Sequence, residues 1–277
     1  MHPDPILTIG KFSVNLYGLF IAIGLIACFI VFYVYTKKKG MPTAVQDFCY
    51  IVIFIAIVLG FLAAYLFQAL YKLIETGEFK FGGITAMGGF IGGAGAFILA
   101  YFLIGKLYFK GRRAKFDYKG QFNTIVLVAG PCIVIAHAFG RLGCLMAGCC
   151  HGTYLGQTPV LGGLLMSGSK GLGYYIPVQL YEAIFLFILF AVLSVFYFKR
   201  CNFILQLYLI LYAVWRFIIE FFRGDAVRGQ FLGIYFSQWQ SFIFIIIAVI
   251  LFIVYHKRKI PLFLPKKEVE TPPVEKE

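Results

Sequence analysis

The sequence reads GRLGCLMAGCCHG over residues 140–152, at the end of an apolar run where a lipid-embedded helix is expected to leave the membrane. This stretch holds one arginine, four glycines, three cysteines and one histidine. Two further segments carry charges inside apolar runs, QLYE at residues 179–182 and RFIIEFFR at residues 216–223. Because charge within a membrane is costly, these segments are expected to form a functional site.

The composition around these segments is that of an integral membrane protein. Of the 277 residues, 61% are hydrophobic and only 13% are charged, which is far from the balance of an ordinary soluble domain. The formal net charge is +13. Its cations gather in short segments between apolar runs, so orientation in an anionic membrane explains them and nucleic-acid binding does not.

Apolar runs of about 20 residues, long enough to cross about 30 Å of hydrocarbon, predict an all-α integral membrane protein with seven transmembrane helices. The N-terminus lacks the basic region of a cleavable signal, so the first run is expected to remain as a span. We predict one seven-span domain over residues 1–260 and a disordered cytoplasmic tail over residues 261–277. Residues 153–176 are expected to form an external loop. The predicted spans are residues 14–36, 45–73, 84–109, 122–142, 177–198, 202–222 and 236–256.

Basic residues follow every second span, which predicts the orientation of the chain. Of the 25 Lys and Arg residues, 17 follow the first, third, fifth and seventh spans. They are Lys37, Lys38, Lys39, Lys106, Lys110, Arg112, Arg113, Lys115, Lys119, Lys199, Arg200, Lys257, Arg258, Lys259, Lys266, Lys267 and Lys276. The positive-inside rule therefore places the N-terminus outside and the C-terminus in the cytoplasm.

A second glycine-rich stretch, FGGITAMGGFIGG, lies at residues 81–93. Two interpretations stay open. Its small residues can let two helices pack closely. Alternatively, it can form a re-entrant or broken helix that lines a polar cavity.

The segment at residues 216–223 places Arg216, Glu220 and Arg223 at positions i, i+4 and i+7, so one helix face is predicted to carry all three. Tyr212 extends that face by one turn. Arg216 and Glu220 can form a structural ion pair that joins helices. Alternatively, two arginines against one carboxylate leave positive charge for a phosphate or phosphodiester, which arginine binds with two parallel hydrogen bonds.

His137 and Arg141 are also four residues apart. His137 is either a satisfied core group or a general base. Arg141 has no carboxylate near it in sequence and adds a third cation to the predicted anion site. Glu182 follows Pro177 at the start of the fifth span, where it can complement the helix dipole or orient a neighbouring arginine.

Three of the seven cysteines, Cys144, Cys149 and Cys150, cluster near His151. The cluster allows three interpretations: a metal site, a disulfide outside the membrane, or packing of small residues. The spacing is not that of a standard zinc motif, and we predict no metal. Cys28, Cys49 and Cys132 lie within apolar runs, where a thiol acts as a small hydrophobic group.

These motifs, together with Tyr17 and Gly18 in the first span, resemble the bacterial prolipoprotein diacylglyceryl transferases. The resemblance extends from about residue 6 to residue 256, and the RFIIEFFR and QLYE blocks are its most specific part. It implies a multi-pass protein of the bacterial inner membrane that moves the diacylglyceryl group of phosphatidylglycerol onto the lipobox cysteine of a prolipoprotein signal peptide, without a cofactor.

The resemblance also implies roles for individual residues. Arg141 and Arg216 would hold the phosphate, with Glu220 and Arg223 shaping the site. Our predicted catalytic residues are Arg141, Arg216, Glu220 and His137. The predicted substrate-binding residues are Tyr17, Arg223, Tyr212, Gln179, Tyr181, Glu182, Gly140, Gly143 and Gly152.

The sequence departs from the family pattern at four positions. Met87 and Ile176 stand where the family often has histidine, and Cys144 and Cys149 stand where it often has asparagine and glutamate. We therefore propose His137 or His151 as the base. Alternatives are a membrane protein of the same fold that binds phospholipid or performs thiol redox chemistry through its three clustered cysteines, and a small-anion transporter.

Overall fold

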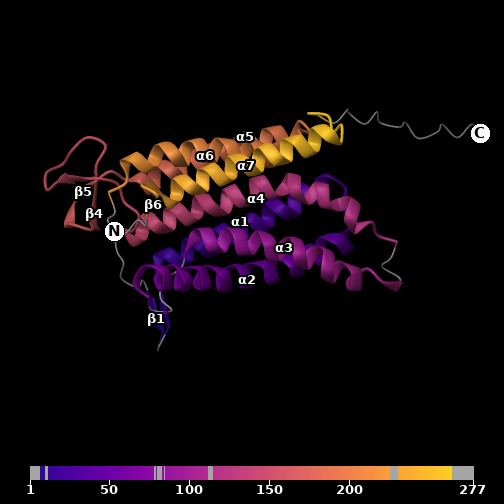
Figure 1. Ribbon diagram of the computed structural model, residues 1–277, viewed down its shortest axis with the longest axis horizontal. Helices are drawn as coiled ribbons and strands as arrows, with labels where there is room; N and C mark the ends of the chain where they lie inside the picture. The colour runs from indigo at the N-terminus through magenta and orange to yellow at the C-terminus, as the bar shows by residue number, and fades with distance from the viewer. Residues whose placement is uncertain are drawn as a thin grey trace, which may run out of the picture. The chain divides into compact units, whose positions relative to one another are not determined.

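A computed structural model describes residues 7–9, 12–77, 79, 83, 85–111, 115–224 and 230–263. Within these residues the chain is mostly helical (Figure 1). Most of the predicted tail lies outside the described residues. The described helices are α1 (Leu16–Lys38), α2 (Thr43–Thr76), α3 (Ala86–Tyr108), α4 (Tyr118–Ala147), α5 (Val178–Phe198), α6 (Ile204–Ile219) and α7 (Phe236–Lys257).

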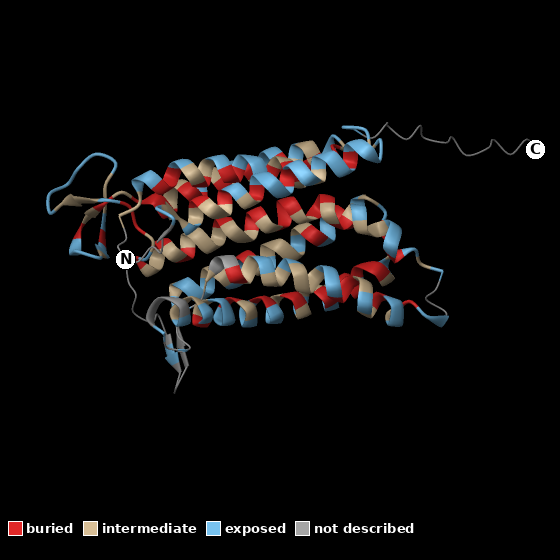
Figure 2. Cartoon of the chain, in the orientation of Figure 1, coloured by how far each residue is buried: buried red, intermediate tan, exposed pale blue. Residues whose placement is uncertain are grey.

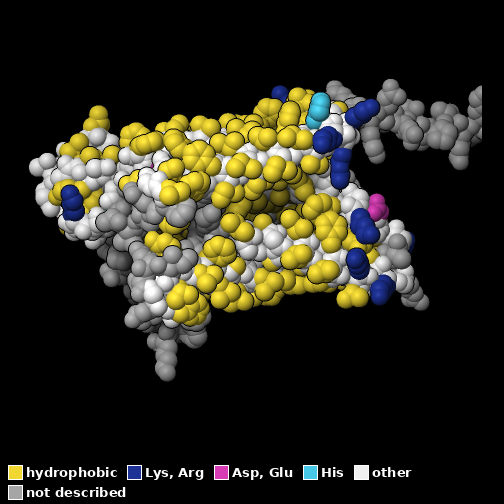
Figure 3. All heavy atoms as spheres, in the orientation of Figure 1, with side chains coloured by type: hydrophobic (Ala, Val, Ile, Leu, Met, Phe, Trp, Pro, Cys, Tyr) yellow, Lys and Arg dark blue, Asp and Glu magenta, His cyan; other side chains and the backbone are white. Residues whose placement is uncertain are grey.

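All seven of these helices, α6 together with the short turn that follows it, are long and apolar enough to cross a membrane. The prediction of seven spanning helices is therefore confirmed for the described residues. Apolar side chains cover much of the face drawn in Figure 3, and many residues of the helices are exposed (Figure 2). Leu99, Leu103 and Leu107, for example, follow one face of α3 and are 60–67% exposed. Such a face is stable in lipid, and the chain is a multi-pass membrane protein.

The chain divides into two compact units, residues 1–29 with 127–277 and residues 30–126. In the second unit, α2 packs against α3 through glycine. A Cβ on Gly92 would lie 2.2 Å from the Ala63 Cβ, and one on Gly60 would lie 3.2 Å from the Gly93 Cα. Helix α3 runs without a break from Ala86. The close-packing interpretation of the glycine-rich stretch is therefore favoured over a broken helix, for the described part of that stretch.

In the first unit, tyrosine and aliphatic side chains fill the core among the helices. Leu186 and Leu193 of α5 are fully buried, as are Ile204 and Tyr208 of α6. On α4, a Cβ on Gly130 would lie 3.1 Å from the Ile204 Cγ2. This close packing holds α4, α5 and α6 together, and these helices carry most of the charged residues of interest.

The described helices agree with the predicted all-α membrane fold, but the loop predicted over residues 153–176 contains short strands that were not predicted. This segment forms an antiparallel sheet of β3 (Tyr154–Gly156), β4 (Leu164–Gly168) and β5 (Gly171–Tyr175), in the order β3-β5-β4. Its inner residues Met166 and Tyr175 pack against Leu145 at the end of α4. Two short hairpins also occur, β1 (Leu7–Ile9) with β2 (Phe12–Val14) and β6 (Gln230–Phe231) with β7 (Ile234–Tyr235).

Two helix ends differ from the predictions. Helix α4 continues past Arg141 to Ala147, so Arg141 lies inside the helix rather than at its exit. Helix α6 ends at Ile219 and tightens into the 3-10 turn η2 (Glu220–Phe222), after which Arg223 is extended. The prediction that one helix face carries Arg216, Glu220 and Arg223 was therefore wrong for Arg223.

Candidate active site

A fully buried carboxylate, that of Glu182 on α5, lies at the centre of the site. Its Oε1 atom is 3.1 Å from the Arg141 Nε of α4, and its Oε2 atom is 3.6 Å from the Arg216 Nη1 of α6. A carboxylate complements the helix dipole only in the first turn of a helix, and Glu182 lies beyond the first turn of α5, so the dipole interpretation of Glu182 is not favoured. Glu182 therefore orients two arginines, and one carboxylate links three helices.

Two polar side chains complete the surroundings of Glu182. The Tyr212 hydroxyl donates a 2.9 Å hydrogen bond to Oε1. The His137 Nε2 lies 3.8 Å from the same oxygen, and its ring meets the Tyr212 ring edge-on at 4.9 Å. The His137 side chain keeps 25% of its surface exposed, so its imidazole is not sealed in the core.

A second carboxylate, that of Glu220, organises the end of α6. The Arg216 Nη2 lies 2.9 Å from the Glu220 Oε2, and the Arg223 Nη1 lies 3.8 Å from the same oxygen. Arg223 reaches Glu220 although it lies beyond the helix, because the 3-10 turn η2 brings residues i and i+3 together, and the Arg223 N–H donates to the Glu220 carbonyl at 3.3 Å. The structure thus brings together all three arginines that the sequence singled out.

The charges in this network do not balance. Arg141, Arg216 and Arg223 face the two carboxylates of Glu182 and Glu220, which leaves one positive charge when all five groups are ionised. Among the described residues, the buried Arg141 Nε and Arg216 Nη1 face Glu182 at ion-pair distance but without hydrogen-bond geometry. The buried Oε2 atoms of Glu182 and Glu220 likewise face guanidinium groups at ion-pair distance without hydrogen-bond geometry. Buried guanidinium donors and a surplus cation suit a phosphate group.

Gly152 positions the loop after α4 beside the end of α6. Its N–H donates to the Ile176 carbonyl at 2.8 Å, and it forms an isolated bridge with Arg223. A Cβ on Gly152 would lie 2.7 Å from the Phe222 carbonyl oxygen, so only glycine fits this approach. The Gln179 side-chain amide donates to the Cys149 carbonyl at 2.5 Å and ties the same loop to α5.

Three other predicted substrate-binding residues, Tyr17, Tyr181 and Gly140, have contacts outside this network or no close contact. Tyr17 packs over Gly143, since a Cβ there would lie 3.1 Å from the Tyr17 carbonyl oxygen. Tyr181 points elsewhere, and its hydroxyl donates to the Gly162 carbonyl at 3.1 Å. A Cβ on Gly140 would meet no atom within 4 Å, so no close contact explains this glycine.

His151 is buried, and both of its ring nitrogens have partners. Nδ1 lies 2.9 Å from the Gly152 carbonyl oxygen, and Nε2 accepts a 2.9 Å hydrogen bond from the Ser169 backbone N–H. A ring that bridges two backbone segments in this way holds the loop against the sheet. This arrangement favours His137 over His151 as the base.

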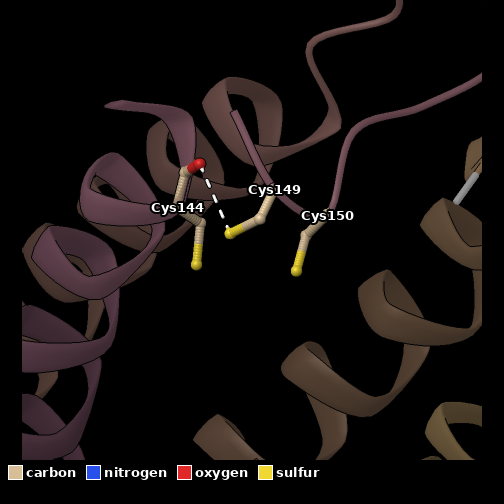
Figure 4. Close-up of side chains that lie close together, drawn as sticks. All are labelled: Cys144, Cys149 and Cys150. Carbon is tan, nitrogen blue, oxygen red and sulfur yellow. Dashed lines mark hydrogen bonds between the residues drawn. The ribbon is translucent and has the colours of Figure 1, made fainter. Parts of the chain in front are cut away.

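The three clustered cysteines are free thiols that lie side by side, Cys144 in the last turn of α4 and Cys149 and Cys150 in the loop after it (Figure 4). Hydrogen bonds with Cys144 and Cys149 lower the pKa of the Cys150 thiol, and the Arg141 and Arg223 guanidinium groups lower it further. The same thiol–thiol contacts raise the pKa of Cys149. The positive charge of the site therefore extends to this loop.

From the sequence, Glu182 was predicted to bind substrate and either to complement the helix dipole or to orient a neighbouring arginine; its contact with two arginines at the centre of the site was not predicted. Its partners lie on other helices, so no i, i+4 spacing could show them. One signal of this pairing was present in the sequence: Arg141 has no acidic residue nearby in sequence and Glu182 has no basic one, so the two charges could pair with each other.

The seven apolar helices define a membrane protein with a buried arginine–glutamate network among its helices. The sequence matches the profile of the prolipoprotein diacylglyceryl transferase family over residues 5–254. The chain belongs to this family.

Individual relatives agree with that assignment. The chain is 31% identical to the phosphatidylglycerol--prolipoprotein diacylglyceryl transferase of Clostridium tetani, covering 88% of this chain and 94% of the relative. It is 31% identical to the protein of the same name from Dehalococcoides mccartyi, covering 94% and 96% of the two chains. A third protein of that name, from Streptococcus pneumoniae, is 28% identical over 96% of this chain and 99% of its own.

Proposed function

We propose that this chain transfers the diacylglyceryl group of phosphatidylglycerol to the lipobox cysteine of prolipoproteins. In this reaction a carbon–sulfur bond forms between the cysteine and the terminal glyceryl carbon. The bond from that carbon to the phosphate oxygen breaks, and glycerol 1-phosphate leaves with the electron pair. Family membership over nearly the whole chain supports this activity and favours it over thiol redox chemistry or anion transport.

One observation carries the assignment of the site: three arginines converge on two buried carboxylates between apolar helices. A phosphate that leaves with an electron pair gains negative charge. Guanidinium groups already held in place stabilise that charge without reorganising during the reaction. We assign phosphate binding to Arg141 and Arg216, and a supporting position at the edge of the site to Arg223.

The carboxylates are assigned to positioning. Glu182 holds Arg141 and Arg216 from one side, and Glu220 holds Arg216 from the other. A buried guanidinium without such partners would be costly and mobile. Tyr212 fixes the rotamer of Glu182 through its hydroxyl. Tyr17 lies over Gly143 of α4, the helix that carries Arg141.

His137 is the proposed general base for the substrate thiol. The thiolate is the nucleophile, so the thiol proton has to be removed before or during attack. His137 lies 3.8 Å from the Glu182 carboxylate, which can stabilise the imidazolium after it accepts the proton. Its partial exposure supports access by a substrate.

The proposed orientation places the N-terminus outside and the C-terminus in the cytoplasm of a bacterial inner membrane. Basic residues lie at the ends of alternate helices and support it: Lys37 and Lys38 end α1, Lys106 lies in the last turn of α3, and Lys199 follows α5. The site then lies near the outer leaflet, where phosphatidylglycerol could enter from the bilayer. We assign residues 1–260 to one membrane domain and residues 261–277 to a cytoplasmic tail.

An in vitro transfer assay tests the function. Purified protein is mixed with phosphatidylglycerol and a peptide that contains a lipobox cysteine, and the mass of the peptide is followed. We expect the mass to rise by one diacylglyceryl group, and a peptide with serine in place of the cysteine to stay unchanged. Failure of the cysteine peptide to gain mass, while the protein is folded and binds phospholipid, would contradict the proposed activity.

A further inference from the structure

The proposed phosphate site does not use the three thiols of Cys144, Cys149 and Cys150. Their sulfur atoms all lie within 4.8 Å of one another. Cys144 and Cys150 are half-buried and Cys149 is exposed. Figure 4 shows that the three side chains come from the last turn of α4 and the loop that follows it.

The backbone is bent so that these thiols meet. Gly148 has a φ of +68°, and the Cys149 N–H donates back to the Cys144 carbonyl at 3.2 Å. Cys150 also has a positive φ, of 59°, which disfavours a residue with a Cβ by about 1–2 kcal/mol. Such strain persists where the surrounding structure fixes it, and it often marks a functional position.

The number and spacing of the sulfur atoms fit a metal ion better than a disulfide. Cys149 and Cys150 are adjacent, so their Cα atoms are about 3.8 Å apart. Disulfides usually need about 4.4–6.8 Å. A disulfide from Cys144 to either neighbour would leave the third thiol unused. A tetrahedral zinc ion with zinc–sulfur bonds of about 2.3 Å separates its sulfur ligands by about 3.8 Å, so rotamer adjustments of less than about 1 Å would complete the site.

We propose that Cys144, Cys149 and Cys150 together bind one thiophilic divalent cation, for which Zn²⁺ is the fitting ion. Three protein ligands leave the fourth tetrahedral position open, which is the arrangement of catalytic rather than structural zinc sites. The prediction of no metal, made from the irregular spacing of these cysteines in sequence, is thereby revised by their convergence in space.

The position of the cluster suggests a use for the open coordination position. Cys144 lies one helical turn after Arg141 on α4. Gln179, which binds the Cys149 carbonyl, lies one turn before Glu182 on α5. The proposed metal site therefore lies about one helical turn, roughly 5 Å, from the arginine–glutamate network.

This use rests on the proposed transferase function. The substrate cysteine would occupy the open position, and a coordinated thiol loses its proton. The proton passes to His137 or to water. The sulfur then forms its bond to the glyceryl carbon, as the bond to the phosphate oxygen breaks and glycerol 1-phosphate leaves with the electron pair. The metal would thus promote loss of the proton from the substrate thiol. This chain has methionine and isoleucine at two positions where its family often has histidine.

Metal binding is tested directly on the full-length protein in detergent. The reduced, chelator-treated protein is titrated with Co²⁺, whose thiolate-to-metal charge-transfer absorption reports sulfur ligands, and Zn²⁺ is then added as a competitor. We expect one ion per chain. Serine at Cys144, Cys149 or Cys150 should weaken binding by at least about 100-fold, since loss of an outer-shell partner alone weakens metal sites by about 10–100-fold. Alanine at the buried Cys49 or Cys201 should leave binding unchanged.

Alkylation gives a second measurement that does not depend on the variants folding. Bound Zn²⁺ should protect three thiols of the native protein from a thiol reagent, and mass spectrometry of peptides should locate them at Cys144, Cys149 and Cys150. No charge-transfer band, or a band that survives all three serine substitutions, would overturn the metal site. Protection of other cysteines instead would also overturn it.

The transfer assay separates the metal site from its use. Transfer that is lost with the chelator, restored by Zn²⁺ and reduced in the three serine variants would support thiol activation. Transfer that continues at its full rate in metal-free protein would overturn activation while the binding data stand. Absence of transfer under every condition would refute the proposed function itself, and the cobalt titration would still decide whether the site binds metal.

Discussion

Two glycine-rich regions of this molecule look alike in sequence and differ in structure. Residues 88–93 of α3 use glycine to bring two helix backbones together, and a Cβ on Gly92 would overlap Ala63. Residues 140–152 also contain four glycines, but the segment carries Arg141 toward Glu182 and ends at a glycine that pairs with Arg223. Glycine permits close approach in both regions. Chemistry is expected only where buried charges accompany it.

The largest expected effect on turnover comes from removing a guanidinium, either Arg141 in the second region or Arg216, which faces it across Glu182. Alanine at Arg216 or Arg141 should lower the transfer rate by about 100–1000-fold, because each removes donors that stabilise the phosphate as it leaves. The measurement is turnover of the lipobox peptide per folded molecule. Lysine at Arg216 keeps the charge without the planar fork and should recover only part of the rate. Full activity in either alanine variant would refute the assigned phosphate site.

The next effect concerns the carboxylate that links three helices. Glu182→Gln keeps the size of the side chain but removes the charge that faces Arg141 and Arg216, so we expect turnover to fall by about 10–100-fold. Breaking a buried ion pair should also destabilise the fold by about 3–5 kcal/mol. Turnover and the thermal unfolding midpoint would both be measured, with the exposed Asp47→Asn as the control. A normal midpoint together with normal turnover would show that Glu182 holds neither arginine.

A smaller effect on turnover is expected at Gly152, where glycine permits a close backbone contact beside a charged residue of the site. Gly152→Ala places a methyl group 2.7 Å from the Phe222 carbonyl oxygen and should displace the Arg223 segment. We expect turnover to fall by about tenfold, because a misplaced charged group loses part of its effect on the reaction. Gly18→Ala on α1 is the control, since its added methyl group meets no atom within 4 Å. Equal rates in the two variants would remove Gly152 from the site.

The smallest effect on turnover is expected in the first region. Gly92→Ala forces a contact of 2.2 Å with the Ala63 Cβ and should destabilise the protein by about 1–3 kcal/mol. Turnover per folded molecule should change little, because no buried charge depends on this position. Gly95→Ala, whose methyl group meets nothing within 4 Å, should leave stability unchanged or slightly raised. A loss of turnover in Gly92→Ala without a loss of stability would contradict the claim that glycine in the first region serves only helix packing.

The helical part of the fold was readable from the sequence because lipid imposes a simple requirement. Each span needs about 20 apolar residues, and the seven runs found in the sequence match α1 to α7 within a few residues at most ends. The sheet over residues 153–176 was not predicted. Its strands are only three to five residues long and rich in glycine, and it is completed by packing on Leu145, which no local pattern reveals.

The site was predictable only as far as its charges were local in sequence. Arg216 and Glu220 are four residues apart, and their ion pair followed from helix periodicity. The pairing of Glu182 with Arg141 joins α5 to α4 and needed the tertiary fold. The cysteine cluster was visible in sequence, but the turn at Gly148 and Cys150 that brings its sulfur atoms together was not.

The central claim is that the buried arginines hold the phosphate of phosphatidylglycerol. Calorimetric titration of purified protein with a short-chain phosphatidylglycerol tests this claim most directly, with the wild type compared with the Arg141→Ala, Arg216→Ala double variant. Hydrogen bonds to charged groups contribute about 1.5–3 kcal/mol each, so loss of two arginines should cost at least about 3 kcal/mol and weaken lipid binding at least about 100-fold. Equal affinity in a folded double variant would contradict the account.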